Sequence, residues 1–227
     1  MTAPAPKAEL MRSLGLLVRG LAALFWGLPL ATLVCAHNVV SDWVLSFGIA
    51  GPLLLTAVLY HGVRQLAYFQ PQERIWMQAV ERAKILALVN FGLSPFIYWW
   101  NRVPEEPFFA AATGLFFVTA LLFVHNLNLA LERLTAMLPD ETLRVDTRLF
   151  TRLNRGLLLA VMLFMGVLYA LLRIHSLPDP VLGVLNDLYN VRHWLITALL
   201  VPPLAMTMTL IWKIKEVIFA SAFDRSE

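Results

Sequence analysis

Apolar residues gather in long blocks along this chain, with short polar segments between them. Six blocks can be drawn, and each approaches the ~20 residues with which a helix crosses a ~30 Å hydrocarbon core. They cover about 14–36, 43–66, 85–100, 108–130, 157–174 and 194–214. The pattern predicts an all-α, polytopic membrane helical bundle with six transmembrane helices, formed by residues 1–227 as a single integral membrane domain.

Helical spacing continues beyond three of these blocks. Gln70-Pro71 is typical of a helix start with proline at the first position, Pro139 ends the fourth helix, and Asp146 is a suitable cap for the fifth. These signals predict cytoplasmic helix extensions over about 71–84, 131–138 and 144–156.

Composition agrees with the block pattern. Hydrophobic residues make up 59% of the chain and charged residues 15%, whereas soluble domains have about 45–50% and about 25%. Cys35 is the single cysteine, which excludes an intrachain disulfide and a thiolate metal site. The net charge of +3 comes from basic residues beside the apolar blocks, so we expect no nucleic-acid partner.

The distribution of basic residues predicts the orientation. The first block resembles a signal peptide but is interpreted as the first span. With the N-terminus in the cytoplasm, fifteen of the eighteen Lys and Arg residues are cytoplasmic, and only Arg102, Arg173 and Arg192 lie outside. The positive-inside rule therefore places both termini in the cytoplasm. We expect the plasma (inner) membrane as the location.

A short pattern recurs in the even-numbered blocks, and the odd-numbered blocks share a glycine near the middle. The recurring pairs are Thr56-Ala57, Thr119-Ala120 and Thr197-Ala198, and the glycines are Gly27, Gly92 and Gly166. If this is not chance, it indicates three in–out–in hairpin repeats around a shared interior.

No nucleotide-binding, hydrolase or metalloprotease motif is present, and no pair of acids lies inside a block. Polar residues from four blocks do share one depth, in the cytoplasmic third of the bilayer. They are Arg19, His61, Asn90, His125 and Asn126, with Asn128 close by. Because polar groups inside a bilayer are costly unless paired, they predict a ligand-binding cavity open to the cytoplasm. Alternatively, the helix ends simply become polar at the headgroups.

Histidines and prolines suggest two further hypotheses. His61 and His125 lie at equal depth and could ligate a haem iron from both faces, whereas His37, His175 and His193 form a weaker outer set. Pro202-Pro203 interrupts the sixth block near its middle. That predicts either a discontinuous helix at a substrate site or a simple kink. In the outer loop before it, Asp179-Pro180 predicts a short helix lying in the interface.

Four arginines follow one stripe of the helix before the fifth block: Arg144, Arg148, Arg152 and Arg155. A basic juxtamembrane stripe suits anionic lipid or an acidic cytoplasmic partner, although a solvated face would look the same. Taken together, these features favour a non-enzymatic membrane component that needs no cofactor, either a subunit of a larger complex or a small channel or transporter. The alternative is a b-type cytochrome anchor with haem b between His61 and His125.

Overall fold

The computed structural model describes residues 6–40, 48–103, 105–138, 140–172 and 179–223. Every regular element in these ranges is a helix, which confirms the predicted all-α class. The six helices are α1 (Pro6–Val40), α2 (Ala50–Leu66), α3 (Arg74–Arg102), α4 (Pro107–Ala136), α5 (Glu141–Leu172) and α6 (Asp179–Phe223).

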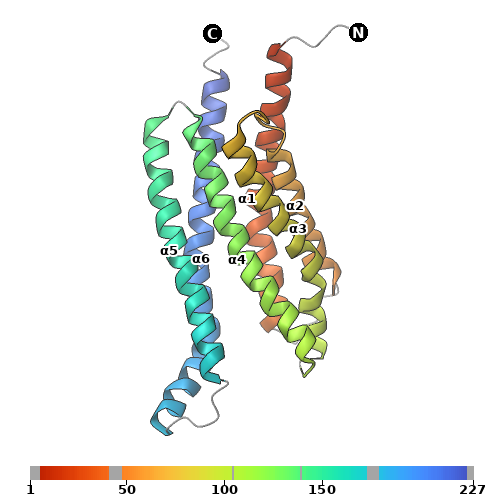
Figure 1. The fold of residues 1–227 in the computed structure, drawn as a ribbon, viewed down its shortest axis with the longest axis vertical. Coiled ribbons are helices and arrows are strands. Elements are labelled where there is room, and N and C mark those ends of the chain that lie inside the picture. The colour runs from red at the N-terminus through yellow and green to blue at the C-terminus, as the bar shows by residue number, and fades with distance from the viewer. Residues whose placement is uncertain (1–5, 41–47, 104, 139, 173–178, 224–227) are drawn as a thin grey trace.

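The helices run up and down along one long axis (Figure 1). The Pro6 end of α1, the Phe223 end of α6 and the α2–α3 and α4–α5 connections all lie at the same end of the bundle. This end is called the terminal end below. Arg102, at the last residue of α3, lies at the opposite end.

Four helices of the described part are long and apolar enough to cross a membrane. The qualifying segments are Met11–Ala36, Pro107–Ala136, Glu141–Val167 and Ala198–Ala220. Large apolar side chains on them point away from the bundle: Trp26 is 63% exposed and Leu163 is 70% exposed. Such a surface requires a lipid solvent. The protein is therefore an integral membrane protein with a helical bundle.

The other two helices, α2 and α3, differ in length and charge. The described part of α2 has 17 residues, and residues 43–47 of the predicted second span lie outside the described ranges. The first half of α3 holds Glu81, Arg82 and Lys84, and Lys84 forms an ion pair with Glu81 at 2.7 Å. The six-span topology thus stays a prediction at these two helices.

The start of α3 differs from the prediction. Residues 71–73 form a turn, after Gln70 with a positive φ of 43°, and the helix begins at Arg74 rather than Pro71. The Glu73 carboxylate accepts the Trp76 backbone N–H and so caps the helix. The carboxylate of Glu73, two residues after Pro71, satisfies the first turn of the helix better than Pro71 does.

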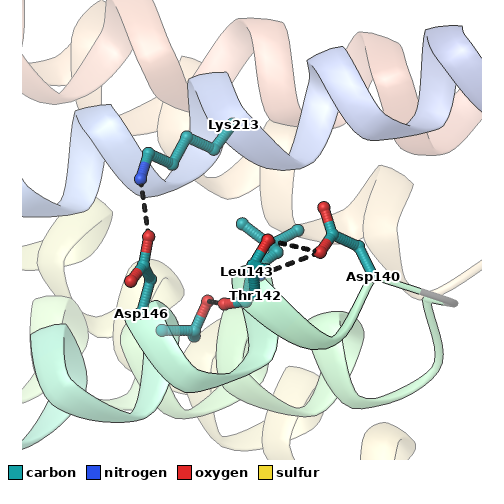
Figure 2. Close-up of polar contacts among 6 residues, drawn as sticks. Asp140, Thr142, Leu143, Asp146 and Lys213 are labelled. Atoms are coloured by element: carbon teal, nitrogen blue, oxygen red, sulfur yellow. Dashed lines mark hydrogen bonds and ion pairs between the residues drawn. The ribbon is translucent and has the colours of Figure 1, made fainter.

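The predicted cap of α5 is also corrected, whereas its continuity is confirmed. Asp140 occupies the cap position: its carboxylate accepts the Thr142 hydroxyl at 2.7 Å and the Leu143 N–H at 3.1 Å, as Figure 2 shows. These two hydrogen bonds lower the pKa of Asp140. Asp146 lies inside the helix, and α5 runs unbroken from Glu141 into the fifth span. The α4 extension is helical to Ala136.

Helix α6 is one continuous element of 45 residues, about 68 Å long. The predicted interfacial helix does begin at Asp179, but it continues directly into the sixth span. The pair Pro202-Pro203 lies inside the helix without breaking it, so the predicted discontinuous helix is wrong.

Two sets of three helices, α1–α3 and α4–α6, are called units below: within each unit every helix contacts the other two, and the most extensive contact, between α3 and α4, joins the units. Consecutive helices pack as hairpins, but the further contacts are α1 with α3 and α6, and α4 with α6. No α3–α5 or α2–α4 contact exists among the described residues, which excludes a threefold arrangement of the hairpins. Exchanging α1–α3 with α4–α6 leaves the set of contacting pairs unchanged. The first helices of the two units, α1 and α4, begin at opposite ends of the bundle (Figure 1).

The interior is apolar and closely packed. Leu17, Leu21 and Leu24 of α1 and Leu210 and Ile211 of α6 are all fully buried. They belong to one cluster with Ala83, Ala87, Leu127 and Leu131. This packing leaves the centre of the bundle filled by aliphatic side chains.

Candidate functional site

The five residues of the predicted cytoplasmic cavity do not meet. Arg19 and His61 are exposed, His125 and Asn126 are half-buried, and Asn90 is buried. The hydrogen bonds of three of them are made with residues outside this set. His61 bonds with Gln65 on its own helix at 2.7 Å, Asn126 donates to the Leu122 carbonyl at 2.8 Å, and Asn90 bonds with Thr119.

Two of these residues, Arg19 and Asn126, line different shallow hollows near the terminal end. One, of about 300 Å³, is lined by Arg19, Val18, Ile218 and Phe219. The other, of about 230 Å³, is lined by Asn126, Arg82 and Arg133. A single cavity holding the five residues is therefore not what the structure contains; their ligand-binding role stays a prediction.

Buried polar contacts instead gather around α3 and α6, each of which contains interior prolines. On α3, the Asn90 Oδ1 accepts the Thr119 hydroxyl of α4 at 2.6 Å, and the Thr56 hydroxyl of α2 lies 3.3 Å from Ser94 Oγ. Pro95 has no N–H for the Phe91 carbonyl, and the Ser94 hydroxyl donates to that carbonyl at 2.9 Å. Two of the three recurring threonines thus contact α3.

On α6, a second cluster joins three helices, and we call it the amide node: Asn128 of α4, Thr151 and Asn154 of α5, and Pro203 and Thr207 of α6. Thr207 Oγ1 accepts from Asn128 Nδ2 at 2.9 Å and from Asn154 Nδ2 at 3.0 Å. It donates to the Pro203 carbonyl at 2.8 Å, which also accepts from Asn154 Nδ2 at 3.2 Å. Asn128, Asn154 and Thr207 are almost completely buried.

The amide node contains oxygens without a partner. Four buried side-chain polar atoms of the described part lack one, and two of them are Asn154 Oδ1 and Thr151 Oγ1. Unpaired buried acceptors are rare because each costs about 1–3 kcal/mol. The unpaired Asn154 oxygen distinguishes the node from the pair of Asn90 and Thr119, where the Asn90 amide oxygen accepts a hydrogen bond.

Sequence reasoning identified Asn128 as a polar residue near the inner end of its helix but missed Thr151 and Asn154. A signal was available. Thr147, Thr151, Asn154 and Leu158 follow a helical stripe beside the arginine stripe, and all four are buried. The arginines drew attention to the adjacent, exposed face.

An ion pair lies at the terminal end of α5 and α6, beyond the amide node. Lys213 Nζ of α6 approaches Asp146 Oδ2 of α5 at 2.8 Å, as Figure 2 shows. The same ammonium lies 5.7 Å from the ring centre of Phe150. Lys213 is six residues from Thr207, about 9 Å along α6.

The arginine stripe is divided in the structure. Arg148, Arg152 and Arg155 are exposed. Arg144 is half-buried, and its Nη2 donates to the Leu138 carbonyl at 3.3 Å, after the last turn of α4. A cation at a helix C-terminus satisfies free carbonyls and the helix dipole. Arg144 is therefore engaged within the chain.

The predicted haem pair finds no support in the geometry. His61 and His125 belong to α2 and α4, which do not contact each other, and α3 packs against both. The His61 ring is exposed and already bonded to Gln65. Among the described residues, no group of three or more His, Cys, Asp or Glu side chains lies close enough to hold a metal. The side chains of His37, His175 and His193 lie outside the described set.

No protein-family model, no curated protein and no solved structure matches this chain. The fold and the buried contacts define its class as a polytopic α-helical membrane protein, and its function has to be inferred from them.

Proposed function

We propose that the chain is a non-enzymatic membrane component of the carrier type, a small transporter whose binding region is the amide node. The observation that supports this proposal is the packing of two three-helix units that exchange without changing the contacts. Many secondary transporters consist of two such units in opposite orientation, with substrate sites on interrupted helices near the middle of the bilayer.

Two helices with interior prolines are equivalent in the two units, although α1, which contains Pro29, has no such counterpart in α4. Exchange of the units relates α3, which contains Pro95, to α6, which contains Pro202 and Pro203. Proline-interrupted helices in corresponding positions are the best sequence indication of a transporter site. The α6 prolines have the unpaired oxygens of Asn154 and Thr151 beside them, which is why we favour this unit.

An open channel fits the packing less well than a carrier does. The space between α1, α3, α4 and α6 is filled by buried aliphatic side chains. A carrier opens its site by moving one unit against the other, whereas a channel needs a continuous wet path. The shallow hollows lined by Arg19 and by Asn126 would form the cytoplasmic approach in this proposal.

The orientation and the partners are part of the proposal. With the terminal end in the cytoplasm of a plasma (inner) membrane, Arg148, Arg152 and Arg155 face the anionic inner leaflet. Val145, Leu149 and Leu153 are exposed on the same stretch of α5, at 50–61%, and would enter the lipid beside these arginines. Anionic headgroups are therefore the partner that we favour over an acidic protein or another subunit.

The orientation is tested by cysteine labelling in intact cells, after Cys35→Ala removes the native thiol. Glu105 lies between α3 and α4, and Glu141 begins α5, so they occupy opposite ends of the bundle. We expect an impermeant maleimide to label Glu105→Cys in intact cells and Glu141→Cys only after permeabilisation. The reverse pattern would place the termini outside and invert the proposal.

The carrier proposal is tested at Thr151, because its hydroxyl has no partner and Thr151→Cys removes no hydrogen bond. A carrier visits states in which the node meets water. We expect an impermeant methanethiosulfonate to modify Thr151→Cys at about 0.1–10% of the rate of Glu141→Cys, the range of a minor conformer's population.

The matched control is Leu127→Cys, a fully buried core position on α4. It should stay unmodified under the same conditions in opened membranes. If Thr151→Cys and Leu127→Cys are equally inert, the node never meets water, and a static structural subunit would replace the carrier proposal.

A further inference from the structure

The donors that Asn128, Asn154 and Thr207 bring to the amide node are all in use. Asn128 Nδ2 donates to its own helix at 2.8 Å and to Thr207 Oγ1 at 2.9 Å. Asn154 Nδ2 donates to the Pro203 carbonyl and to Thr207 Oγ1, and the Thr207 hydroxyl donates to the same carbonyl. The polar atoms that remain unpaired are two oxygens, Asn154 Oδ1 and Thr151 Oγ1.

These oxygens share one face of α5, and the Asn154 side chain contacts Pro203 of α6. Thr151 and Asn154 are three residues apart on α5, and they are 5% and 1% exposed. On α6, Pro202 and Pro203 have no N–H, so the carbonyls of Ala198 and Leu199 lose their usual helical donors. Carbonyls freed in this way are the groups with which interrupted membrane helices coordinate ions.

We infer that the amide node binds a small monovalent metal cation, of the Na⁺ kind, with Asn154 Oδ1 and Thr151 Oγ1 as its side-chain ligands. An anion would need several free donors, whereas the Thr151 hydroxyl is the one donor that the node residues leave unpaired. A divalent cation would call for carboxylates, and no described group of His, Cys, Asp or Glu lies there. The neighbouring Arg155 is exposed.

This inference rests on the proposed function, because it names the ion that such a carrier would couple to transport. It also explains why the Asn90 pair in the other unit differs. There the amide oxygen already accepts the Thr119 hydroxyl at 2.6 Å, so it is not left without a partner.

The test uses the purified full-length protein in detergent, with thermal unfolding followed in sodium, potassium or choline chloride at equal ionic strength. A ligand that binds only the folded state raises Tm with the logarithm of its concentration once that concentration exceeds Kd. We expect a rise of about 3–8 °C in one metal salt relative to choline, the range for about 10–100 times Kd. Binding of ²²Na⁺ in a scintillation proximity assay supplies a second readout.

Two variants remove one ligand each, and a third is the matched control. Thr151→Val and Asn154→Leu should abolish the salt-dependent rise and the ²²Na⁺ signal. Asn90→Leu changes the paired amide of the other unit and should keep both. If Asn154→Leu does not fold, Thr151→Val still decides, because it removes an oxygen that has no partner.

Equal Tm values in all three salts, with no ²²Na⁺ binding, would overturn the cation site and leave the oxygens to water. A salt-dependent rise that survives both Thr151→Val and Asn154→Leu would overturn it as well. The carrier proposal fails separately, in the labelling of Thr151→Cys. If Thr151→Cys is modified but Tm does not depend on the salt, only the cation site is overturned. If Tm depends on the salt but Thr151→Cys is not modified, only the carrier proposal is overturned.

Discussion

We expect Trp76→Ala to cost about 3–5 kcal/mol of unfolding free energy, the range for deleting a large buried aromatic side chain. Trp76 is fully buried at the start of α3, and its Nε1 donates to the Phe69 carbonyl at 2.8 Å. Its ring meets Phe69 edge to face, with 6.4 Å between the ring centres. One side chain thus joins the α2–α3 connection to the core.

Two further variants separate packing from the hydrogen bond. Trp76→Phe keeps most of the buried area but loses the indole donor, so a smaller loss of about 1 kcal/mol is expected. Trp26→Ala truncates a tryptophan that is 63% exposed on α1 and should change stability by about 0.5 kcal/mol or less.

SDS titration in mixed micelles, followed by far-ultraviolet circular dichroism, measures all three Trp76 and Trp26 variants. If Trp76→Ala unfolded at the same SDS fraction as Trp26→Ala, burial at the α2–α3 connection would contribute nothing to stability, and the prediction would be wrong.

The second large effect is expected where α1 and α2 approach most closely. A Cβ added at Gly20 would lie 2.7 Å from the Gly62 carbonyl oxygen, and one added at Gly62 would lie 3.1 Å from the Gly20 carbonyl oxygen. The obstacles are backbone atoms, which cannot turn away. We therefore expect Gly20→Val to cost about 3 kcal/mol, the upper part of the range for overpacking.

Glycines without neighbours provide the control for Gly20. A Cβ at Gly92 in α3 meets nothing within 4 Å, so Gly92→Ala should be neutral or stabilise the helix by about 0.5–1 kcal/mol. The same SDS titration compares the two. Equal stability of Gly20→Val and Gly92→Ala would contradict the close α1–α2 contact.

Hydropathy was sufficient to predict the helices, because long apolar blocks leave a chain in lipid no other structure. The residues at which individual helices begin were harder to predict. Pro71 and Asp146 both have the chemistry of a helix start, but Glu73 and Asp140 lie closer to the first unpaired N–H groups and take that role. Local chemistry gives several candidates, and the packing of the turn selects one.

The site was only partly predictable for a different reason. Depth in the membrane follows from position along a helix, and six polar residues did share a depth. Whether they meet depends on rotation and on which helices are neighbours, and neither can be read from a single sequence. Asn90 and Asn128 are buried, whereas Arg19 and His61, at a similar depth, face outward. The three mid-block glycines also differ in their surroundings. A Cβ added at Gly27 would lie 2.9 Å from the Leu59 side chain of α2, whereas one added at Gly92 or Gly166 would meet nothing within 4 Å.

Helix α4 hydrogen-bonds to α3, through Thr119 and Asn90, and to α6, through Asn128 and Thr207. The two residues are nine positions apart, about 14 Å along the axis and two and a half turns, so they project from opposite sides of α4. Rotation of α4 about its own axis would swing them in opposite directions and strain both bonds together. A sliding motion along the axis would shift both the same way. A rotation of α6 that turns α4 would therefore also displace the Thr119 side chain at α3. Helix α4 thus couples rotation in its own unit to the neighbouring unit.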